Sequence, residues 1–577
     1  MATEGKTIIR RLPVGVTNFK VLRNNHRYYV DKTMYLQKME ETSDFLFLIR
    51  PRRFGKSLFL SMVGDYYDCE NKDIDDEFDG TWVGEHPLDN KGQFQVLQYD
   101  FSQVLANIDN LEGDFNSYCN IQLNGFIRKY GKYYCEDTIR QVREAKLPGQ
   151  KINIIAYEAK QRGYHLYLII DEYDNFTNSV LNERGNDVYQ QMTHSDGFYR
   201  NVFKIFKPNF EKILFMGVSP ITLDDLTSGF NIATNISLHP HFDMLLGFSE
   251  TDVREMIRYY QEVGLVKGEE DAIIADMKPW YDNYCFAEEC YDVNPRMFNS
   301  NMVLYYMNSM ITTGHAPSSM IDPNTKTDYA KMKRLVNLDR LDGNRKGIVQ
   351  RIAEKGYIDA DIVPSFPAYE MVKPDMFVSL LYYYGMLTIG GRSLDTPHLV
   401  IPNNNIREQY YRFLLEQYQD TCKLDLSELG DAFRAAALEG KWEPLCQYLA
   451  DHYYEDSSIR DAIQGEHNIQ GYFKAYLNLS RLFVAHPEVE MNHGYCDFFL
   501  LSNTKKYQPL KHSFIIEVKY LKADASDGEA EQQWEAAKKQ VKSYADDKTV
   551  KALTTDVRLH CIVLQFKAGK LQKMAEV

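Results

Sequence analysis

Short apolar runs alternate with longer amphipathic stretches over the first 220 residues. Four runs have the length and composition of buried strands, at 43–50, 96–101, 167–170 and 213–219. Helical patterns lie between them, at 56–67, 112–130, 136–162 and 196–208. Buried apolar strands that alternate with helices are typical of a parallel α/β sheet. We therefore expect an α/β fold in this part of the chain.

The pattern changes after residue 250. Ser249 is a suitable N-cap for a helix that begins with ETDVREMI, and helical patterns then dominate up to about 460. A helix at 376–384, followed by short strands at 386–391 and 398–403, suggests a winged-helix-like unit. The last section predicts a helix at 466–483, a hairpin of strands at 495–501 and 513–519, a helix at 528–546 and a strand at 557–566. At about 150 residues per domain, 577 residues predict three to four domains. We place the boundaries at 1–250, 251–460 and 461–577.

Composition narrows the function classes. The chain has 66 basic and 81 acidic residues, a formal net charge of −15, 44% hydrophobic and 25% charged residues. These values are ordinary for a globular protein, and they exclude disorder, collagen-like repeats and a uniformly basic chain that coats phosphates. The first residues lack the apolar region of a secretory signal, and no apolar run reaches about 18 residues. The nine cysteines are scattered without a zinc spacing, so we expect reduced thiols, no membrane span and a cytoplasmic location.

The first candidate site is a phosphate-binding loop. Residues 50–57 read RPRRFGKS between a strand and a helix, close to the pattern G-x-x-x-x-G-K-[ST], with Arg50 in place of the first glycine. Arg53, Phe54 and Gly55 would present backbone N–H groups to phosphates at the helix N-terminus. Lys56 would reach the β- and γ-phosphates and Ser57 would hold Mg²⁺. These residues predict ATP and Mg²⁺ as cofactors.

The second half of this site should be an acid at the end of another buried strand. Asp171 follows such a strand and would bind Mg²⁺, and Glu172 would orient or deprotonate the attacking water. The alternative is a solvated acidic turn. Ser219 ends the strand at 213–218, before Thr222, where a polar side chain could sense the γ-phosphate; the alternative is an ordinary strand-end serine.

The second candidate site is a metal-dependent nuclease centre. Asp497 lies near the start of one predicted strand, and Glu517 and Lys519 lie two apart on the next. Residues two apart in a strand share a face, so Glu517 and Lys519 should enter one cleft that Asp497 can join. The two carboxylates and the Val518 carbonyl form an all-oxygen set suited to Mg²⁺ or Mn²⁺, and Lys519 would position the attacking water. The alternative is a surface hairpin with a Glu–Lys pair.

Four further residues are candidates for the same cleft. Glu490 could complete the metal shell and Glu466 is a weaker candidate, while Gln540 and Tyr544 lie four apart on one helix face. A solvated or packing role fits each of them equally well. Residues 501–577 carry 14 Lys and Arg against 10 Asp and Glu, a local excess where a nucleic-acid backbone would bind. A solvated charged face explains the same numbers.

Both sites, in this order, resemble a bacterial family with an AAA-ATPase-like domain followed by a PD-(D/E)XK nuclease superfamily domain. The resemblance rests on LPVGVTNF, YYVDKT, RPRRFGKS, LIIDEYD, GVSPI, LLGFSETDV, WYDNYCF, GYCDFFLL and IIEVKY. The family shares the arginine at Arg50 but usually has a small residue where this chain has Arg296 after Asn-Pro, so a sensor role for Arg296 stays open. The resemblance implies a nucleotide-binding module coupled to a nuclease-like module, in mobile-element or phage-related biology.

The expected fold is α/β, with a P-loop NTPase parallel sheet, a helical or winged middle region and a restriction-endonuclease-like C-terminal domain. The expected function is an ATP-regulated nuclease acting on DNA or RNA. Two alternatives stay open: a nucleotide-dependent switch or scaffold whose vestigial nuclease fold binds a partner, and an ATPase motor with a nucleic-acid-binding tail. A homo-oligomer is also left open.

Overall fold

The computed structural model divides the chain into two compact units, each with a sheet of its own. The first comprises residues 1–346 and 357–405, and the second comprises 347–356 and 406–577. The structure describes residues 9–105, 110–193, 197–221, 233–317, 319–322, 345–367, 370, 373–419, 425–455, 466–477, 479–480, 482–486, 490–491, 494–504 and 507–577. The domain boundaries expected from the sequence remain predictions.

The first unit is built on a five-stranded sheet in the order β2-β3-β4-β1-β5. All of its strand pairs are parallel, as predicted. The strands are β1 (Phe45–Ile49), β2 (Phe94–Asp100), β3 (His165–Asp171), β4 (Lys212–Gly217) and β5 (Thr234–Asn235). The four predicted strands are therefore confirmed. Because β4 lies between β1 and β3, the loop after β1 and the acids after β3 open onto one sheet edge on either side of the end of β4.

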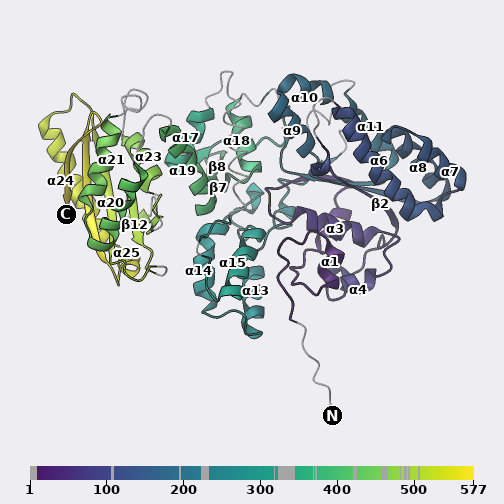
Figure 1. Cartoon of the computed structure of the whole chain (residues 1–577), viewed down its shortest axis with the longest axis horizontal. Coiled ribbons are helices and arrows are strands. Elements are labelled where there is room, and N and C mark those ends of the chain that lie inside the picture. Colours follow the sequence, from purple (N-terminus) through teal and green to yellow (C-terminus); the bar gives the residue numbers. More distant parts are fainter. Residues whose placement is uncertain are drawn as a thin grey trace, which may run out of the picture. The chain divides into compact units, whose positions relative to one another are not determined.

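Helices cover both faces of this sheet, which explains why its strands are apolar throughout. Figure 1 shows α1, α3 and α4 on one side of the sheet and α6, α9 and α11 on the other. Helix α3 contacts β2 and β3, and its buried residues Leu60, Val63 and Tyr67 join the main core cluster. The helices up to residue 221 are α1 (Phe19–Asn24), α2 (Tyr35–Glu40), α3 (Lys56–Tyr67), α4 (Ile74–Phe78), α5 (Trp82–Glu85), α6 (Leu111–Tyr130), α7 (Glu136–Glu144), α8 (Pro148–Arg162), α9 (Asn175–Arg184), α10 (Asn186–Thr193) and α11 (Phe198–Asn209).

The single helix predicted at 136–162 is wrong, because the chain forms α7 and α8 with an extended break between them. Leu147 has φ −95° and ψ 139°, and Pro148 is the first residue of α8. A proline disfavours the helical conformation of the residue before it but suits the first helical position, so it ends one helix and starts the next.

The predicted cap at Ser249 is confirmed: its hydroxyl accepts a hydrogen bond from the Asp252 N–H, 3.2 Å away.

The rest of the first unit is mainly helical, with one small antiparallel sheet. Its helices are α13 (Glu250–Glu262), α14 (Glu270–Tyr281), α15 (Ser300–Thr313) and α18 (Pro374–Tyr383). The sheet has the order β6-β8-β7, from β6 (Tyr357–Asp359), β7 (Thr388–Ser393) and β8 (Thr396–Val400). The predicted helix and two strands are present, but the hairpin turns at Leu394, with φ 57°, so its strands reach closer to the turn than predicted.

The second unit is a five-stranded sheet in the order β15-β14-β13-β12-β9, in which only β13 and β14 are parallel. Its strands, with a separate two-stranded pair, are β9 (Phe483–His486), β10 (Glu490–Met491), β11 (Gly494–Tyr495), β12 (Phe498–Ser502), β13 (His512–Leu521), β14 (Arg558–Lys567) and β15 (Lys570–Glu576). The remaining helices are α17 (Arg345–Lys355), α19 (Asn404–Gln419), α20 (Leu426–Glu439), α21 (Glu443–Glu455), α23 (Glu466–Leu477), α24 (Asp527–Ala545) and α25 (Lys548–Leu553).

Alternate residues of each strand point to opposite faces of this sheet. Phe499 and Ile515 pack with Trp534 and Val541 of α24, while Phe498 lies against Phe473 of α23.

Two predictions for the second unit need correction. The helix predicted at 466–483 ends at Leu477, since residue 483 already begins β9, and Asp497 lies just before β12 rather than within a strand. In the described part of the chain, no helix is long and apolar enough to cross a membrane.

Candidate functional site

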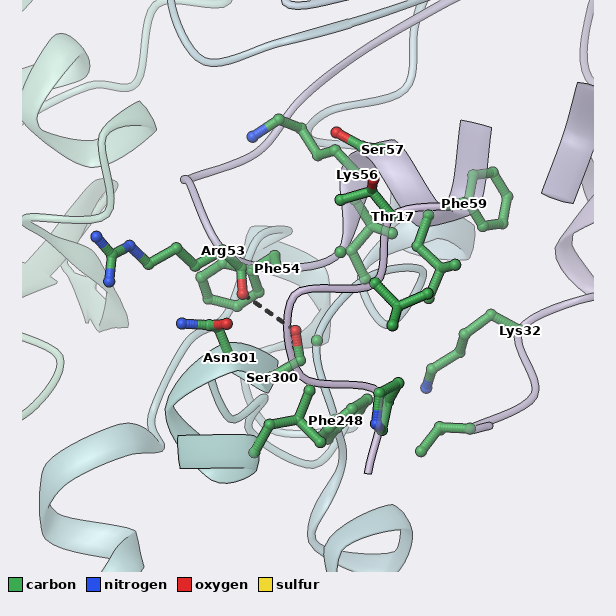
Figure 2. A pocket seen from close by; sticks show the side chains of 18 of the residues that line it. Thr17, Lys32, Arg53, Phe54, Lys56, Ser57, Phe59, Phe248, Ser300 and Asn301 are labelled. Carbon is green, nitrogen blue, oxygen red and sulfur yellow. Dashed lines mark hydrogen bonds between the residues drawn. The ribbon is translucent and has the colours of Figure 1, made fainter. Parts of the chain in front are cut away.

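The conformation of the loop between β1 and α3 is fixed by two residues with positive φ and by hydrogen bonds to its main chain. Gly55 has φ 96° and Arg53 has φ 70°, and the left-handed conformation at Gly55 favours a residue without Cβ. The Arg53 carbonyl accepts hydrogen bonds from the Ser300 hydroxyl (3.1 Å) and the Asn301 N–H (3.2 Å), at the start of α15 (Figure 2). The Gly247 N–H donates to the Phe54 carbonyl at 3.1 Å. The loop is thus braced by segments about 200 to 250 residues away in sequence.

The structure brings together four of the predicted site residues at the end of the sheet. The Ser57 hydroxyl donates a hydrogen bond to the Asp171 carboxylate. The Lys56 amine is buried, donates to the carbonyls of Arg50 (3.2 Å) and Pro51 (3.1 Å), and lies 3.9 Å from a Glu172 carboxylate oxygen. One amine, one hydroxyl and two carboxylates therefore meet where the loop and β3 end.

Burial changes the acid chemistry of this group. Desolvation raises the pKa of Asp171 to about 6, and the hydrogen bond from Ser57 opposes that shift. A bound divalent cation would relieve the same desolvation, because it supplies a positive charge beside the carboxylate. Glu172 has φ 50°, a left-handed conformation that is uncommon for a residue other than glycine.

Ser219 lies between the loop and the acids, as the position of β4 requires, but its hydroxyl is fully buried and accepts from the Ile221 N–H at 3.3 Å. A residue outside the predicted site fixes this strand end. The buried Asp174 carboxylate accepts hydrogen bonds from the N–H groups of Val218 (3.1 Å) and Ser219 (2.8 Å). The sequence signal was present in LIIDEYD, whose third acid is Asp174.

The Arg50 side chain stabilises the loop through hydrogen bonds to main-chain carbonyls. Its guanidinium donates to the carbonyls of Ile49 (3.0 Å), Ser237 (2.6 Å) and Phe242 (2.9 Å), and it lies 4.2 Å from the centre of the Phe286 ring. The side chain is only 1% exposed, and desolvation lowers its pKa. Arginine therefore replaces the usual glycine at a position where its side chain ties the loop to the segment after β5.

The side chains of Phe54 and Arg53 have different surroundings, one in the core and one beside a carboxylate. The Phe54 ring is buried edge-on against Tyr284, with centroids 4.9 Å apart, so it anchors the loop in the core. One guanidinium nitrogen of Arg53 lies 3.9 Å from the Asp322 carboxylate. Arg296, whose role the sequence left open, stacks on the ring of Tyr291 at 3.9 Å.

A cavity of about 400 Å³ adjoins the loop, and sequence reasoning did not identify its far wall. Lys56 and Ser57 (Figure 2) line its polar side together with Glu172. Its apolar side comes from segments on either side of the loop in sequence. It includes Val16, Tyr28, Val30, Leu245, Phe248 and Leu304. All of these except Leu304 belong to motifs that carry the family resemblance. The cavity thus joins a polar end at the loop to an apolar end, an arrangement suited to a nucleotide.

The second predicted site is also brought together, in the other unit. The Asp497 carboxylate accepts from the Val518 N–H at 2.7 Å, and the Asp497 N–H donates to the Glu517 carboxylate at 3.4 Å. The Lys519 amine lies 2.8 Å from Glu517, which is only 1% exposed. The predicted shared face of Glu517 and Lys519 is therefore present. In the part of the chain described, no cluster of three or more His, Cys, Asp or Glu side chains is arranged to hold a metal, so an ion here would rest on two carboxylates and carbonyl or water oxygens.

Gln470 is a neighbour of this site that the sequence analysis missed. Its side-chain amide donates to the Asp497 carboxylate at 2.8 Å from α23. On α24, the Gln540 amide donates to the Tyr544 hydroxyl; burial is the main reason that the pKa of Tyr544 is raised, with the nearby Glu517 charge adding to it. The side chains of Glu490 and Glu466, and all of Thr222, lie outside the described residues.

Comparisons with known proteins agree with these two sites. Residues 13–227 match a family model described as predicted AAA-ATPase, and residues 464–576 match one described as PD-(D/E)XK nuclease superfamily. The chain therefore has an AAA-ATPase-like domain at its N-terminal side and a PD-(D/E)XK nuclease superfamily domain at its C-terminal side.

Two individual proteins are similar to this chain. A protein encoded in the region 5′ of vnfD in Azotobacter chroococcum mcd 1 is 27% identical over 292 residues, which is 48% of this chain and 49% of that protein. The chain thus matches about half the length of this relative. The Aeropyrum pernix ORC2 protein, solved in ADPNP and ADP complexes, aligns with 72% of this chain and 98% of its own at 11% identity, with a TM-score of 0.31.

Proposed function

We propose that the first unit binds and hydrolyses ATP with Mg²⁺, and that the C-terminal domain is a metal-dependent nuclease acting on DNA or RNA. The observation that carries the first half is the meeting of Lys56, Ser57 and Asp171 at the mouth of a cavity with an apolar end. In this proposal the loop N–H groups and Lys56 hold the phosphates, and the apolar wall holds the base.

The residues present fit a magnesium ion beside the phosphates. Ser57 and Asp171 offer two oxygen ligands, and because burial raises the pKa of Asp171, a divalent cation beside this carboxylate would favour its charged form. Ser57 and Asp171 would hold the ion, whose positive charge would offset the charge of the phosphates. Glu172, which lies within 4 Å of the Lys56 amine, would orient the attacking water and accept its proton.

The nuclease half rests on the convergence of Asp497, Glu517 and Lys519. Both carboxylates are hard oxygen ligands, so they fit Mg²⁺ or Mn²⁺. Such an ion would polarise the scissile phosphate. Lys519 would hold the attacking water, and Gln470 and the Val518 N–H would fix the orientation of the Asp497 carboxylate.

A cleavage and turnover panel tests both halves. Wild type, Glu172→Gln and Asp497→Asn are assayed on single- and double-stranded DNA and RNA, with Mg²⁺ or Mn²⁺ and with or without ATP. We expect Glu172→Gln to bind ATP but turn it over at least about 10²-fold more slowly, and Asp497→Asn to lose cleavage but keep turnover. ATP binding without cleavage of any substrate by wild type would favour the switch or scaffold with a vestigial nuclease fold. Turnover stimulated by DNA, again without cleavage, would favour the motor.

A further inference from the structure

A second, larger cavity lies in the same unit and is lined by some of the same elements as the nucleotide cavity. It measures about 940 Å³. Its lining includes three arginines, Arg10, Arg11 and Arg27, and two asparagines, Asn25 and Asn308, but neither Asp nor Glu. We call it the arginine groove. Ile9, Val14 and Leu265 also line it and are 44%, 50% and 37% exposed, so its apolar surface is open to a ligand.

Acidic side chains of the described residues do not neutralise the charges of the arginine groove. Among the residues that the structure describes, no carboxylate lies within ion-pair distance of Arg10, Arg11 or Arg27, whereas Arg254 contacts three acids. Three guanidinium groups in one acid-free groove, on a chain with a net charge of −15, form a localised anion-binding surface.

Main-chain contacts hold these arginines in place. The Arg10 N–H donates to the Tyr259 hydroxyl at 2.7 Å, and the Tyr260 hydroxyl donates to the Arg10 carbonyl at 3.0 Å. The Tyr28 N–H donates to the Arg11 carbonyl at 2.8 Å. The Arg27 guanidinium donates to the Leu12 carbonyl at 3.1 Å. Because the backbone is fixed by partners of its own, the exposed side chains of Arg10 and Arg11 can be directed at a ligand without ordering the chain first.

The groove and the nucleotide cavity share their walls. Leu12 and Val14 line the groove, while Pro13 and Thr17 of the same segment line the nucleotide cavity. Helices α13 and α15 likewise line both, as Met256 and Leu304 face the nucleotide cavity while Tyr260 and Asn308 face the groove. Because residues four apart share a helix face, a ligand in the groove would contact α13 and α15 one turn further along the face that lines the nucleotide cavity.

We infer that the arginine groove binds the phosphate backbone of a single-stranded nucleic acid. Guanidinium groups pair with phosphate oxygens, the asparagines offer further donors, and the exposed apolar side chains offer a surface for bases. The choice of nucleic acid over an acidic protein rests on the proposed function, because a nuclease domain in the same chain requires a nucleic-acid substrate.

The experiment measures binding without metal or ATP, so that it does not depend on either proposed activity. A fluorescent single-stranded 20-mer, as DNA and as RNA, is titrated with full-length wild type in EDTA at several salt concentrations. Arg10→Ala/Arg11→Ala should bind at least tenfold more weakly. The slope of log K against log salt should fall by about 1.4, at roughly 0.7 per lost phosphate contact on a single strand. Asn308→Asp, which adds a negative charge and leaves every arginine in place, should also weaken binding.

The matched control is Arg128→Ala/Arg143→Ala, two exposed arginines on α6 and α7. It should bind like wild type. Equal binding by Arg10→Ala/Arg11→Ala and wild type, an equal loss in the control, or no binding by wild type would each overturn the inference. Polyglutamate of the same charge competing as well as the oligonucleotide would also overturn it, because the occupant would then be an acidic protein surface. Weak binding by the groove variants in a chain that never cleaves would support the groove and contradict only the nuclease.

Discussion

The Ser57 hydroxyl donates a hydrogen bond to the Asp171 carboxylate, joining the first turn of α3 to the end of β3 across 114 positions of the sequence. Helix α3 follows β1, and Asp171 ends β3. Because β4 lies between β1 and β3 in the sheet, the contact spans the end of β4. It joins the predicted phosphate-binding loop to the acidic strand end, and the same two oxygens are the ligands that the proposed magnesium site needs.

Removing the Lys56 amine should weaken nucleotide binding. Lys56→Ala is expected to raise the dissociation constant for ATP at least tenfold, about 1.4 kcal/mol, because a charge-assisted contact to phosphate is lost. Isothermal titration calorimetry with Mg²⁺-ATP measures this directly. Lys146→Ala, an exposed lysine just before α8, is the control and should bind like wild type. Unchanged affinity in a folded Lys56→Ala chain would remove the phosphate-binding assignment.

The raised pKa of Asp171 predicts a pH-dependent loss of stability without metal or nucleotide. Its pKa of about 6 in the folded chain lies above the value of about 3.9 in an unfolded chain. Between these values the folded state keeps a proton that the unfolded state has released, so stability falls as the pH rises through 4 to 6. Asp171→Asn has no such proton, so its stability relative to wild type should rise by up to about 3 kcal/mol between pH 4 and 7.5. Urea unfolding of both chains tests this, and a difference that stays flat with pH would contradict it.

Restoring the usual loop glycine should damage the fold. Arg50→Gly removes a buried guanidinium that satisfies three carbonyls, and we expect the free energy of unfolding to fall by at least about 3 kcal/mol. Arg50→Met keeps much of the packing volume, so it separates lost packing from lost hydrogen bonds and should also be destabilised. Denaturant unfolding measures both. A stable Arg50→Gly chain that binds ATP more tightly would show that Arg50 only replaces a glycine.

Gln470 should act on the nuclease site through Asp497. Gln470→Ala is expected to raise the Mg²⁺ concentration for half-maximal cleavage by about 10- to 100-fold, because the Asp497 carboxylate loses a partner that orients it. Gln447→Ala, at a half-buried glutamine on α21, should leave the metal dependence unchanged. A slower rate with the same metal dependence would assign Gln470 to packing alone.

The sequence predicted the elements whose pattern is local and missed the contacts that depend on tertiary structure. Strands β1 to β4 are apolar along their length because both faces are covered, and Glu517 and Lys519 follow from the strand period. The edge strand β15 has mostly polar, exposed positions, so no apolar alternation marks it. The break before Pro148 was readable from the sequence.

The missed site contacts join distant segments. Arg50 reaches carbonyls 187 and 192 residues away, and Ser300 reaches the loop from 247 residues away. Gln470 contacts Asp497 from a separate helix, 27 residues earlier. No spacing in the sequence marks such pairs, because it is the packing of α15 and α23 that sets them.

The central claim is that Asp497 and Glu517 share one divalent cation. The most direct measurement is an anomalous difference map from crystals of the chain grown with MnCl₂. We predict a Mn²⁺ peak in contact with both carboxylates, at oxygen distances of about 2.0–2.2 Å, with Lys519 beside it. The same map from Asp497→Asn crystals should lack that peak. A map with Mn²⁺ bound only elsewhere, and the two carboxylates bridged by protein donors alone, would contradict the metal-dependent nuclease.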